Sequence, residues 1–197
     1  MKYLFFRTDR IGDFLITAPL IHAVKNKKSK SIICVVASTK NYEFIKNYKF
    51  VDEIFILKKN NIINKLKLFF QLRKYKYDAI IVSDKKNRSI LLTIILKSKK
   101  KIFNVSKKFN KKILDLLFDD VFLDNDNEIN YPIKKILENN CNSLNLHLKD
   151  ENFHYLKKNQ FINSFTHNDI LLSNYENFIV FHYDEKWEIE NYSKVFK

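Results

Sequence analysis

Long apolar runs are missing from this chain of 197 residues. A membrane-spanning helix needs roughly 18 to 20 consecutive apolar residues, and here a lysine or an asparagine interrupts every apolar stretch well before that length. The apolar run after Met1 is also too short for a secretory signal peptide and leads directly into a polar segment at Arg7. We therefore predict a cytoplasmic protein.

Cysteine is almost absent as well. The two cysteines, Cys34 and Cys141, lie far apart in the sequence, and Cys34 sits in the apolar run 31–36, where a buried thiol is ordinary. The five histidines form neither a His-Glu-x-x-His spacing nor part of a Cys-x-x-Cys site. These patterns predict neither a disulfide framework nor a metal site.

Glycine is the scarcest of the structurally special residues, because Gly12 is the only one in the chain. A chain with one glycine cannot form the G-x-G-x-x-G or P-loop spacing, which disfavours a nicotinamide-dinucleotide or ATP-cradling role. A glycine is needed where the backbone adopts a positive φ or where another group approaches closely. We expect one of these two requirements at Gly12.

Acidic residues are outnumbered by basic ones, 22 to 36, which gives a formal charge of +14. Clustered cations bind phosphate backbones by releasing counterions. However, only four of the 36 are arginines, the residue best suited to bidentate recognition of phosphates and bases. The lysines are spread along the chain, which favours the compositional bias of an AT-rich genome over a dedicated nucleic-acid surface. Attraction to anionic lipid headgroups is an intermediate possibility.

Short apolar runs alternate with longer segments of helical period, a pattern typical of βαβ units and a parallel sheet. Strands are predicted at 3–6, 31–37, 53–57, 79–82 and 102–105, and helices at 14–24, 62–72, 90–96 and 133–138. A polar stretch at 150–174 precedes a further apolar run at 178–182. We predict an α/β fold, a Rossmann-like parallel sheet with helices on both faces, as domain 1–172, followed by the start of a second α/β domain at 173–197.

The segment 7–13 connects the first predicted strand to the first predicted helix. In open parallel sheets, ligands bind beyond the carboxyl ends of the strands, where loops and helix N-termini present donors and charges. Gly12 by itself could form a tight turn, and Asp13 could be a helix cap or a favourable first-turn acid. Two arginines, two aspartates and the only glycine within seven residues exceed what a turn needs, so this segment is the predicted functional site.

The pattern Arg7-x-Asp9-x-Ile11-Gly12-Asp13-x-Leu15-x-x-x-Pro19 resembles the opening motif of glycosyltransferase family 9, the heptosyltransferases of lipopolysaccharide core biosynthesis. Residues 77–81 before a polar loop, and residues 178–187 with their Lys-Trp turn, follow the order of the family in outline. The resemblance covers the whole chain but only about half of a family member. It implies the N-terminal domain of a two-domain GT-B enzyme, with the second domain truncated.

The resemblance also implies roles for individual residues. Asp13 is the expected catalytic base of an inverting, metal-independent sugar transfer from a nucleotide-sugar donor, by default ADP-linked, to a lipopolysaccharide-core acceptor. Arg7, Gly12, Arg88 and Ser89 are expected to bind the acceptor, and Lys186 the donor diphosphate. No cofactor and no specific nucleic-acid partner are expected. An acceptor in a bilayer would suit a peripheral contact with the cytoplasmic face of the inner membrane, and little activity is expected of this chain alone.

Simpler explanations exist for several of these residues. Arg88 and Ser89 could belong to a solvated helix cap, Asp84 could cap the helix that follows it, and Lys186 could be a solvated lysine on a charged turn. The alternative function is a non-catalytic basic module that binds nucleic acid or an anionic membrane surface. Lysine-driven binding to a polyanion weakens steeply with salt and should depend little on Arg7 or Asp13.

Overall fold

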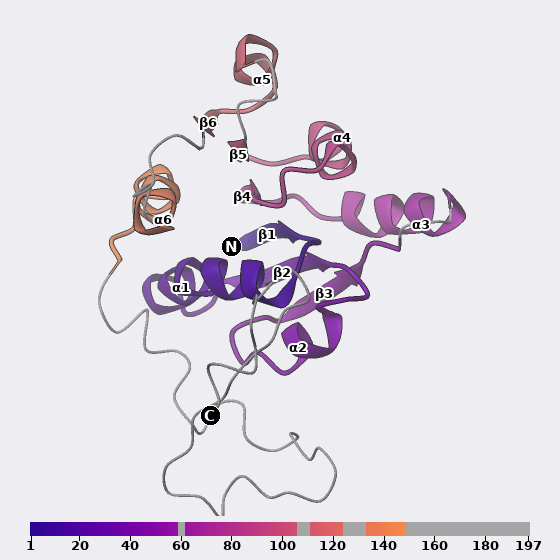
Figure 1. Ribbon diagram of the computed structural model, residues 1–197, viewed down its shortest axis with the longest axis horizontal. Coiled ribbons are helices and arrows are strands. Elements are labelled where there is room, and N and C mark those ends of the chain that lie inside the picture. Colours follow the sequence, from indigo (N-terminus) through magenta and orange to yellow (C-terminus); the bar gives the residue numbers. More distant parts are fainter. Residues whose placement is uncertain (59–61, 106–110, 124–132, 149–197) are drawn as a thin grey trace, which may run out of the picture. The chain divides into compact units, whose positions relative to one another are not determined.

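The computed structural model describes residues 1–58, 62–105, 111–123 and 133–148, and strands and helices alternate along them (Figure 1). The strands are β1 (Lys2–Arg7), β2 (Ile32–Ala37), β3 (Glu53–Ile56), β4 (Ala79–Val82), β5 (Lys101–Val105) and β6 (Asp120–Leu123). The helices are α1 (Ile11–Lys27), α2 (Tyr42–Lys46), α3 (Ile62–Arg73), α4 (Asn87–Ile95), α5 (Lys111–Leu117) and α6 (Ile133–Ser143).

The six strands form one parallel sheet in the order β3-β2-β1-β4-β5-β6. Strand β1 lies inside the sheet, where Tyr3 is in register with Ile33 of β2 on one side and with Ala79 of β4 on the other. The chain builds outward from β1 to β3 and then returns to add β4 on the other side. This reversal creates a topological switch point at the carboxyl ends of β1 and β4, the usual ligand crevice of such sheets.

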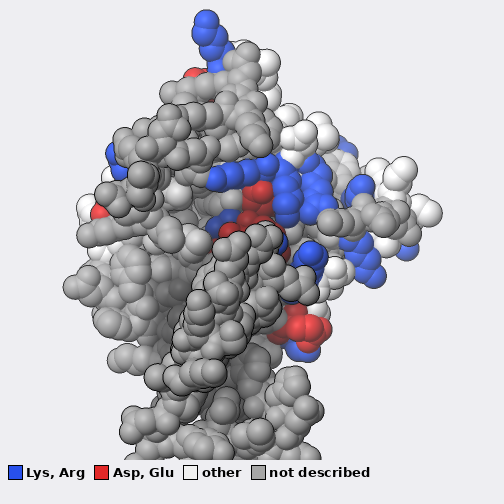
Figure 2. Space-filling view, in the orientation of Figure 1, with Lys and Arg blue, Asp and Glu red and all other residues white. Residues whose placement is uncertain are grey.

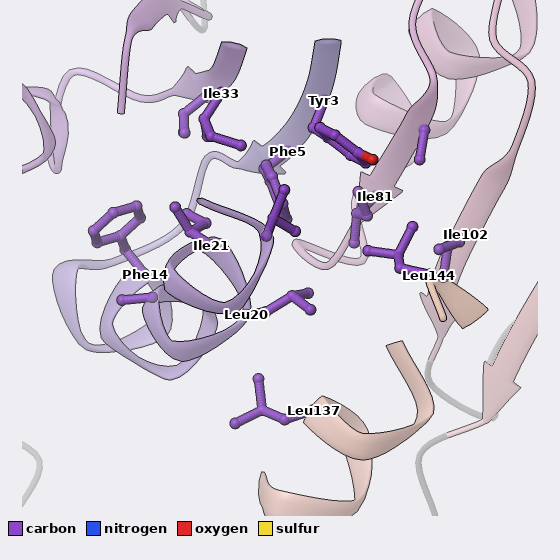
Figure 3. Packing of buried hydrophobic residues seen from close by; sticks show 14 of the residues in the cluster. Tyr3, Phe5, Phe14, Leu20, Ile21, Ile33, Ile81, Ile102, Leu137 and Leu144 are labelled. Carbon is purple, nitrogen blue, oxygen red and sulfur yellow. The ribbon is translucent and has the colours of Figure 1, made fainter. Parts of the chain in front are cut away.

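The core has two layers because alternate residues of a strand point to opposite faces of the sheet. Tyr3 and Phe5 of β1 belong to the cluster that α1 and α6 cover, and Figure 3 shows Leu20 of α1 between Phe5 and Leu137 of α6. Residues of α3, α4 and α5 pack in the other cluster, with Leu4 and Phe6 of β1. The sheet is therefore covered on both faces, as the sequence predicts.

Every strand and helix predicted within the described residues is present, with small shifts of its ends. Three short elements were not predicted: α2, α5 and β6. They are four to seven residues long, too short to show a reliable apolar period. Packing against the sheet stabilises them instead, through residues such as Ile45, Leu114 and Phe118.

Two helix starts differ from the prediction. Helix α1 begins at Ile11, so Gly12 and Asp13 belong to its first turn and not to the preceding loop. Helix α4 begins at Asn87, so Arg88 and Ser89 also lie in a first turn and not in a loop. The start of α4 is fixed by the carbonyl of Lys86, which accepts the backbone N–H of Ser89 at 2.9 Å.

The apolar run at 178–182, the predicted domain boundary at 172/173 and Lys186 lie outside the described residues. Cys34 and Cys141 are both buried with free thiols, and burial raises the pKa of each to about 12.

The helices in the described part of the chain are too short or too polar to cross a bilayer.

Candidate functional site

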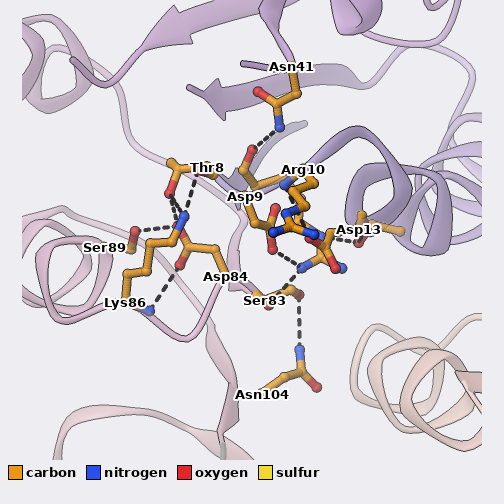
Figure 4. Close-up of polar contacts among 12 residues, drawn as sticks. Thr8, Asp9, Arg10, Asp13, Asn41, Ser83, Asp84, Lys86, Ser89 and Asn104 are labelled. Atoms are coloured by element: carbon orange, nitrogen blue, oxygen red, sulfur yellow. Dashed lines mark hydrogen bonds and ion pairs between the residues drawn. The ribbon is translucent and has the colours of Figure 1, made fainter. Parts of the chain in front are cut away.

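The loops that follow β1 and β4 meet at the switch point. Nη1 of Arg7, at the end of β1, donates a hydrogen bond of 2.7 Å to the carbonyl oxygen of Ser83, which follows β4. The hydroxyl of Thr8 donates to the carboxylate of Asp84, one residue further along each loop (Figure 4). These contacts join residues 76 positions apart in the sequence and build one site from two loops.

Arg7 is buried, with 6% of its surface exposed. Its Nε donates to the hydroxyl of Thr17 in α1 at 2.7 Å, and its Nη1 donates to Oδ2 of Asp9 at 2.8 Å as well as to Ser83. The guanidinium thus links the end of β1, helix α1 and the β4–α4 loop. These hydrogen bonds of Arg7 connect parts of the protein, whereas the resemblance implied a contact between Arg7 and the acceptor.

Asp9 is the residue whose importance the sequence did not reveal. Oδ2 is paired with Arg7, while Oδ1 is buried and has no hydrogen-bond partner among the described residues. Burial raises the pKa of Asp9 to about 6; the Asp13 and Asp84 carboxylates add to this rise, and the Arg7 guanidinium partly offsets it. The motif Arg7-x-Asp9 was visible, but no sequence pattern reports that one carboxylate oxygen is buried without a partner.

Asp13 lies in the first turn of α1 and is half-buried. Its Oδ2 accepts the backbone N–H of Arg10 at 3.1 Å, which closes the helix N-terminus and fixes the carboxylate. An acid in this position is also stabilised by the helix dipole. The capping interpretation of Asp13 is therefore correct, and its carboxylate remains part of the cavity walls described below.

Gly12 does not have a positive φ, so that expectation is wrong. It occupies a helical position, and a Cβ placed on it would have no atom of another described residue within 4 Å, its chain neighbours and the backbone of its own helix aside. Neither backbone strain nor crowding within the described chain requires a glycine here. The other expected reason, close approach by another molecule, remains a prediction.

Asp84 is buried and has several donors around it. It accepts the hydroxyls of Thr8 and Ser89, the latter at 2.6 Å, and the backbone N–H of Lys86 at 3.4 Å. Ser89 is fully buried, so its hydroxyl is used within the protein to hold Asp84. Lys85, the residue after Asp84, has a φ of 51°. This left-handed conformation is held in place by the hydrogen bonds of the loop.

Two cations complete the β4–α4 side of the site. Nζ of Lys86 donates to the carbonyl oxygen of Thr8 at 2.6 Å, and Nη2 of Arg88 donates to the Thr8 hydroxyl at 3.3 Å. Nε of Arg88 is buried without a hydrogen-bond partner among the described residues. The Arg88 guanidinium therefore reaches the β1–α1 loop from the start of α4, with one N–H still unsatisfied.

The β1–α1 loop is also tied to the end of β2. Asn41 is fully buried, and its Nδ2 donates to the backbone carbonyl of Arg7 at 2.8 Å. The hydroxyl of Ser38 donates to the backbone carbonyl of Asp9 at 3.3 Å. Fixed on both sides, the loop holds Asp9 and Asp13 in place before any ligand binds, which is the preorganisation that a binding or catalytic site needs.

Two cavities flank these carboxylates, and Asp9 and Asp13 line both. One, of about 210 Å³, has the buried amides Asn104 and Asn140 in its wall together with apolar side chains of α1 and α6. These two amides hydrogen-bond to each other at 3.1 Å and so connect β5 to α6. The wall of this cavity also includes five charged residues, the carboxylates Asp9, Asp13 and Asp84 and the cations Arg7 and Lys85.

The other cavity, of about 360 Å³, is lined by four cations and two carboxylates. The cations are Arg10, Lys40, Lys86 and Arg88. Lys and Arg side chains border a small acidic patch near the centre of Figure 2. A carboxylate beside a cationic cavity suits a ligand that carries both a hydroxyl to be deprotonated and an anionic group. Within the described residues no group of three or more His, Cys, Asp or Glu side chains has an arrangement that could hold a metal ion.

The strand order and the site at the switch point define a Rossmann-like domain, the type found as the N-terminal domain of GT-B glycosyltransferases. No protein-family model and no curated protein matches this chain. Several solved structures, in contrast, do match this chain. The Escherichia coli heptosyltransferase WaaC with ADP matches with a TM-score of 0.60 and 15% identity, over 76% of this chain and 49% of that one.

Two further solved structures agree. A glycosyl transferase family 9 protein from Veillonella parvula matches with a TM-score of 0.57 and 13% identity over 76% of this chain and 42% of its own. The Escherichia coli ADP-heptose lps heptosyltransferase II matches with a TM-score of 0.50 and 21% identity over 61% and 34%. The chain spans at most about half the length of these proteins. The likeness confirms, at the level of the fold, the resemblance that the opening motif indicated.

Proposed function

We propose that this chain is the acceptor-side domain of an inverting glycosyltransferase that transfers a sugar from a nucleotide-sugar donor to a lipopolysaccharide-core acceptor. The observation that carries the proposal is the Asp13 carboxylate, which is fixed at the start of α1 and lines both cavities at the switch point. The fold of the heptosyltransferases supports the reaction class.

Asp13 is the better base of the two neighbouring carboxylates. Asp9 is tied into an ion pair with buried Arg7 and has only 18% of its side chain exposed. Among the described residues the Asp13 carboxylate accepts the backbone N–H of Arg10, in place of the ion pair that engages Asp9. In the proposed step it takes the proton of an acceptor hydroxyl while the hydroxyl oxygen bonds to the anomeric carbon and the bond to the diphosphate breaks.

The cationic cavity supplies the second part of the proposal. Arg88 and Lys86 lie on its β4–α4 side and Arg10 on its α1 side, and all three face the space beside Asp13. An acidic acceptor sugar would place its anionic group here and its nucleophilic hydroxyl at Asp13. Gly12 has no Cβ, and no described residue beyond its own helix and its chain neighbours lies within 4 Å of the position that a Cβ would take. It therefore leaves the ligand room at the helix N-terminus.

The donor is proposed from the solved relatives. One WaaC structure contains ADP and another ADP-2-deoxy-2-fluoro heptose, which favours an ADP-linked sugar here, and no metal is proposed for its transfer. Lys186 remains the proposed contact to the donor diphosphate. Because the chain covers about half of these enzymes, we expect it to bind the acceptor but to transfer sugar slowly, if at all, by itself.

The test is a calorimetric titration of the chain with a delipidated lipopolysaccharide-core oligosaccharide, followed by the same titration of Asp13→Asn, Arg88→Ala and Asp115→Asn. Asp115 is exposed on α5, so its variant matches the chemical change at Asp13 far from the site. We expect both site variants to weaken binding at least tenfold, as loss of a charged hydrogen-bond partner does, and Asp115→Asn to leave it unchanged.

A different result would assign a different function. If the oligosaccharide does not bind, and duplex DNA binds with steep salt dependence and no sensitivity to Asp13 or Arg88, the chain is a basic binding module.

Transfer of heptose from ADP-heptose to the acceptor, lost in Asp13→Asn and kept in Asp115→Asn, would support the catalytic assignment directly.

A further inference from the structure

Exposed apolar side chains are concentrated on one helical layer. Among the described residues, eight of the twelve large hydrophobic residues that are exposed belong to α3, α4 and α5. They are Ile62, Ile63, Leu66, Phe70, Leu91, Ile95, Ile113 and Leu116. On the helices of the opposite layer the described residues show only Ile11, exposed at 39%. Scattered apolar residues need no explanation, but this grouping on one layer does.

Helix α3 carries the densest part of this surface. Ile62, Ile63, Leu66 and Phe70 are 73%, 62%, 51% and 58% exposed, and their spacing places them along one side of the helix. Leu68 and Leu72, at 3% and 0%, form the side that packs on the sheet. The outward apolar stripe is therefore additional to the apolar face that folding requires.

Charge of one sign accompanies the stripe. Residues 54–77 contain seven lysines and arginines and no aspartate or glutamate. Lys67, Arg73, Lys74 and Lys76 in this stretch are exposed. The region at the right of Figure 2, where α3 lies in Figure 1, shows these two kinds of surface together, blue basic side chains beside uncharged ones.

We propose that the outer face of α3 docks on the surface of an anionic phospholipid bilayer, with Ile63, Leu66 and Phe70 entering the headgroup region and the flanking lysines contacting lipid phosphates. An apolar stripe bordered by lysines is the pattern of a helix that lies in the membrane interface. Anionic headgroups also attract basic segments close to the surface. The charge of the partner is thus complementary to the exposed cations of the stretch.

Two other occupants fit the observations less well. A second copy of this chain on the same face would bring two acid-free basic stretches together, which like-charge repulsion disfavours. Nucleic acid would satisfy the lysines but would offer phosphates where the stripe presents isoleucine, leucine and phenylalanine. Only a surface that is apolar below an anionic layer matches both features.

The location also suits the candidate site. Helix α3 follows β3, so it starts at the carboxyl edge of the parallel sheet, the same edge at which Asp9 and Asp13 lie. A bilayer on α3 would present lipid-linked molecules on the side of the domain where the site opens. Docking itself requires no substrate, so it can be tested whether or not the proposed transfer is correct.

The test is sedimentation of the full chain with vesicles of one part phosphatidylglycerol to three parts phosphatidylethanolamine, compared with pure phosphatidylcholine vesicles. Phe70→Ser should lower the partition coefficient about tenfold, because burying a phenylalanine is worth about that factor. Lys67→Glu/Lys74→Glu should lower it by about 25-fold or more, since each lysine near the surface contributes about fivefold.

Matched controls separate the face from the net charge. Ile32→Ser removes an apolar residue with 40% exposure at the start of β2, outside α3, α4 and α5. Lys30→Glu/Lys49→Glu changes the total charge as much as the α3 pair does, at exposed positions outside α3. Both controls should bind within about threefold of the parent, because charges distant from the surface are screened. Unchanged melting temperatures establish that the variants are folded.

Three outcomes would overturn the proposal. Equal losses in the α3 variants and their controls would mean that binding reflects net charge alone. Equal binding to phosphatidylcholine would remove the role of the cations. A concentration-dependent dimer abolished by Phe70→Ser, without a change in vesicle binding, would identify the stripe as an interface between copies of the chain.

Discussion

Arg7 and Asp9 form a buried ion pair in which Nη1 lies 2.8 Å from Oδ2, and the same nitrogen donates to the carbonyl oxygen of Ser83. Their side chains are 8% and 18% exposed. The pair therefore does more than neutralise two charges, because it joins the loops that follow β1 and β4. The candidate site rests on this connection.

Arg7→Met is expected to destabilise the fold by about 3 kcal/mol, because removing one partner of a buried pair leaves the other charge uncompensated. Urea unfolding measures this effect. Lys46→Met is the control: its ion pair with Glu43 has side chains 50% and 73% exposed, and its loss should be too small to measure.

A double-mutant cycle checks that the cost belongs to the pair. Arg7→Met/Asp9→Asn should be clearly more stable than the sum of the single effects predicts, because both charges are then absent. Additive effects would show that Arg7 stabilises the site through Thr17 and Ser83 alone.

Asp9 should make stability depend on pH between about 4 and 6. Its pKa is about 6 in the folded protein and 3.8 is the ordinary value, so the folded state binds the proton more tightly than the unfolded state. The stability that Asp9 gains from binding this proton is fully present below about pH 4 and is lost as the pH rises through about 6. Arg7, Asp13 and Asp84 face it and set this value together with burial.

The measurement compares the parent with Asp9→Asn at pH 7 and pH 5. The parent should gain about 1 kcal/mol relative to the variant when the pH falls from 7 to 5. A constant difference between the two proteins would show that Asp9 keeps an ordinary pKa in the fold.

Gly12→Ala separates folding from ligand binding. Alanine has a higher helix propensity, and its Cβ would crowd no described residue beyond its own helix, so stability should rise by roughly 0.5–1 kcal/mol. If a ligand approaches this turn, the same variant should bind the core oligosaccharide more weakly. A more stable protein with unchanged binding would remove Gly12 from the acceptor site.

Ser89→Ala should destabilise the fold by about 1–3 kcal/mol, because buried Asp84 loses the donor that lies 2.6 Å from it. If Ser89 acts only through Asp84, acceptor affinity should fall in Ser89→Ala no further than in Thr8→Val, which removes another donor to the same carboxylate. A selective loss of binding in Ser89→Ala, with stability unchanged, would instead indicate direct contact with the acceptor.

The fold could be predicted because its signals are local and strong. Buried parallel strands such as β2 and β4 are nearly continuous apolar runs, and helices such as α3 repeat apolar residues at helical spacing. The short elements α2, α5 and β6 could not be predicted, because packing of a few side chains on the sheet stabilises them. The starts of α1 and α4 were placed too late for a related reason: the polar first turn of a helix has no apolar period.

The sequence by itself determined the class of fold and indicated the place of the candidate site, because ligands of open parallel sheets bind beyond the carboxyl ends of the strands and the motif 7–13 follows the first strand directly. Only the tertiary structure decided what each residue does there. It buried Arg7 as the link between two loops, left one oxygen of Asp9 without a partner, and turned Ser89 inward to Asp84. The link between the two loops depends on contacts between residues 76 to 80 positions apart, and a linear pattern does not encode which distant side chains share one cavity or lose their access to water.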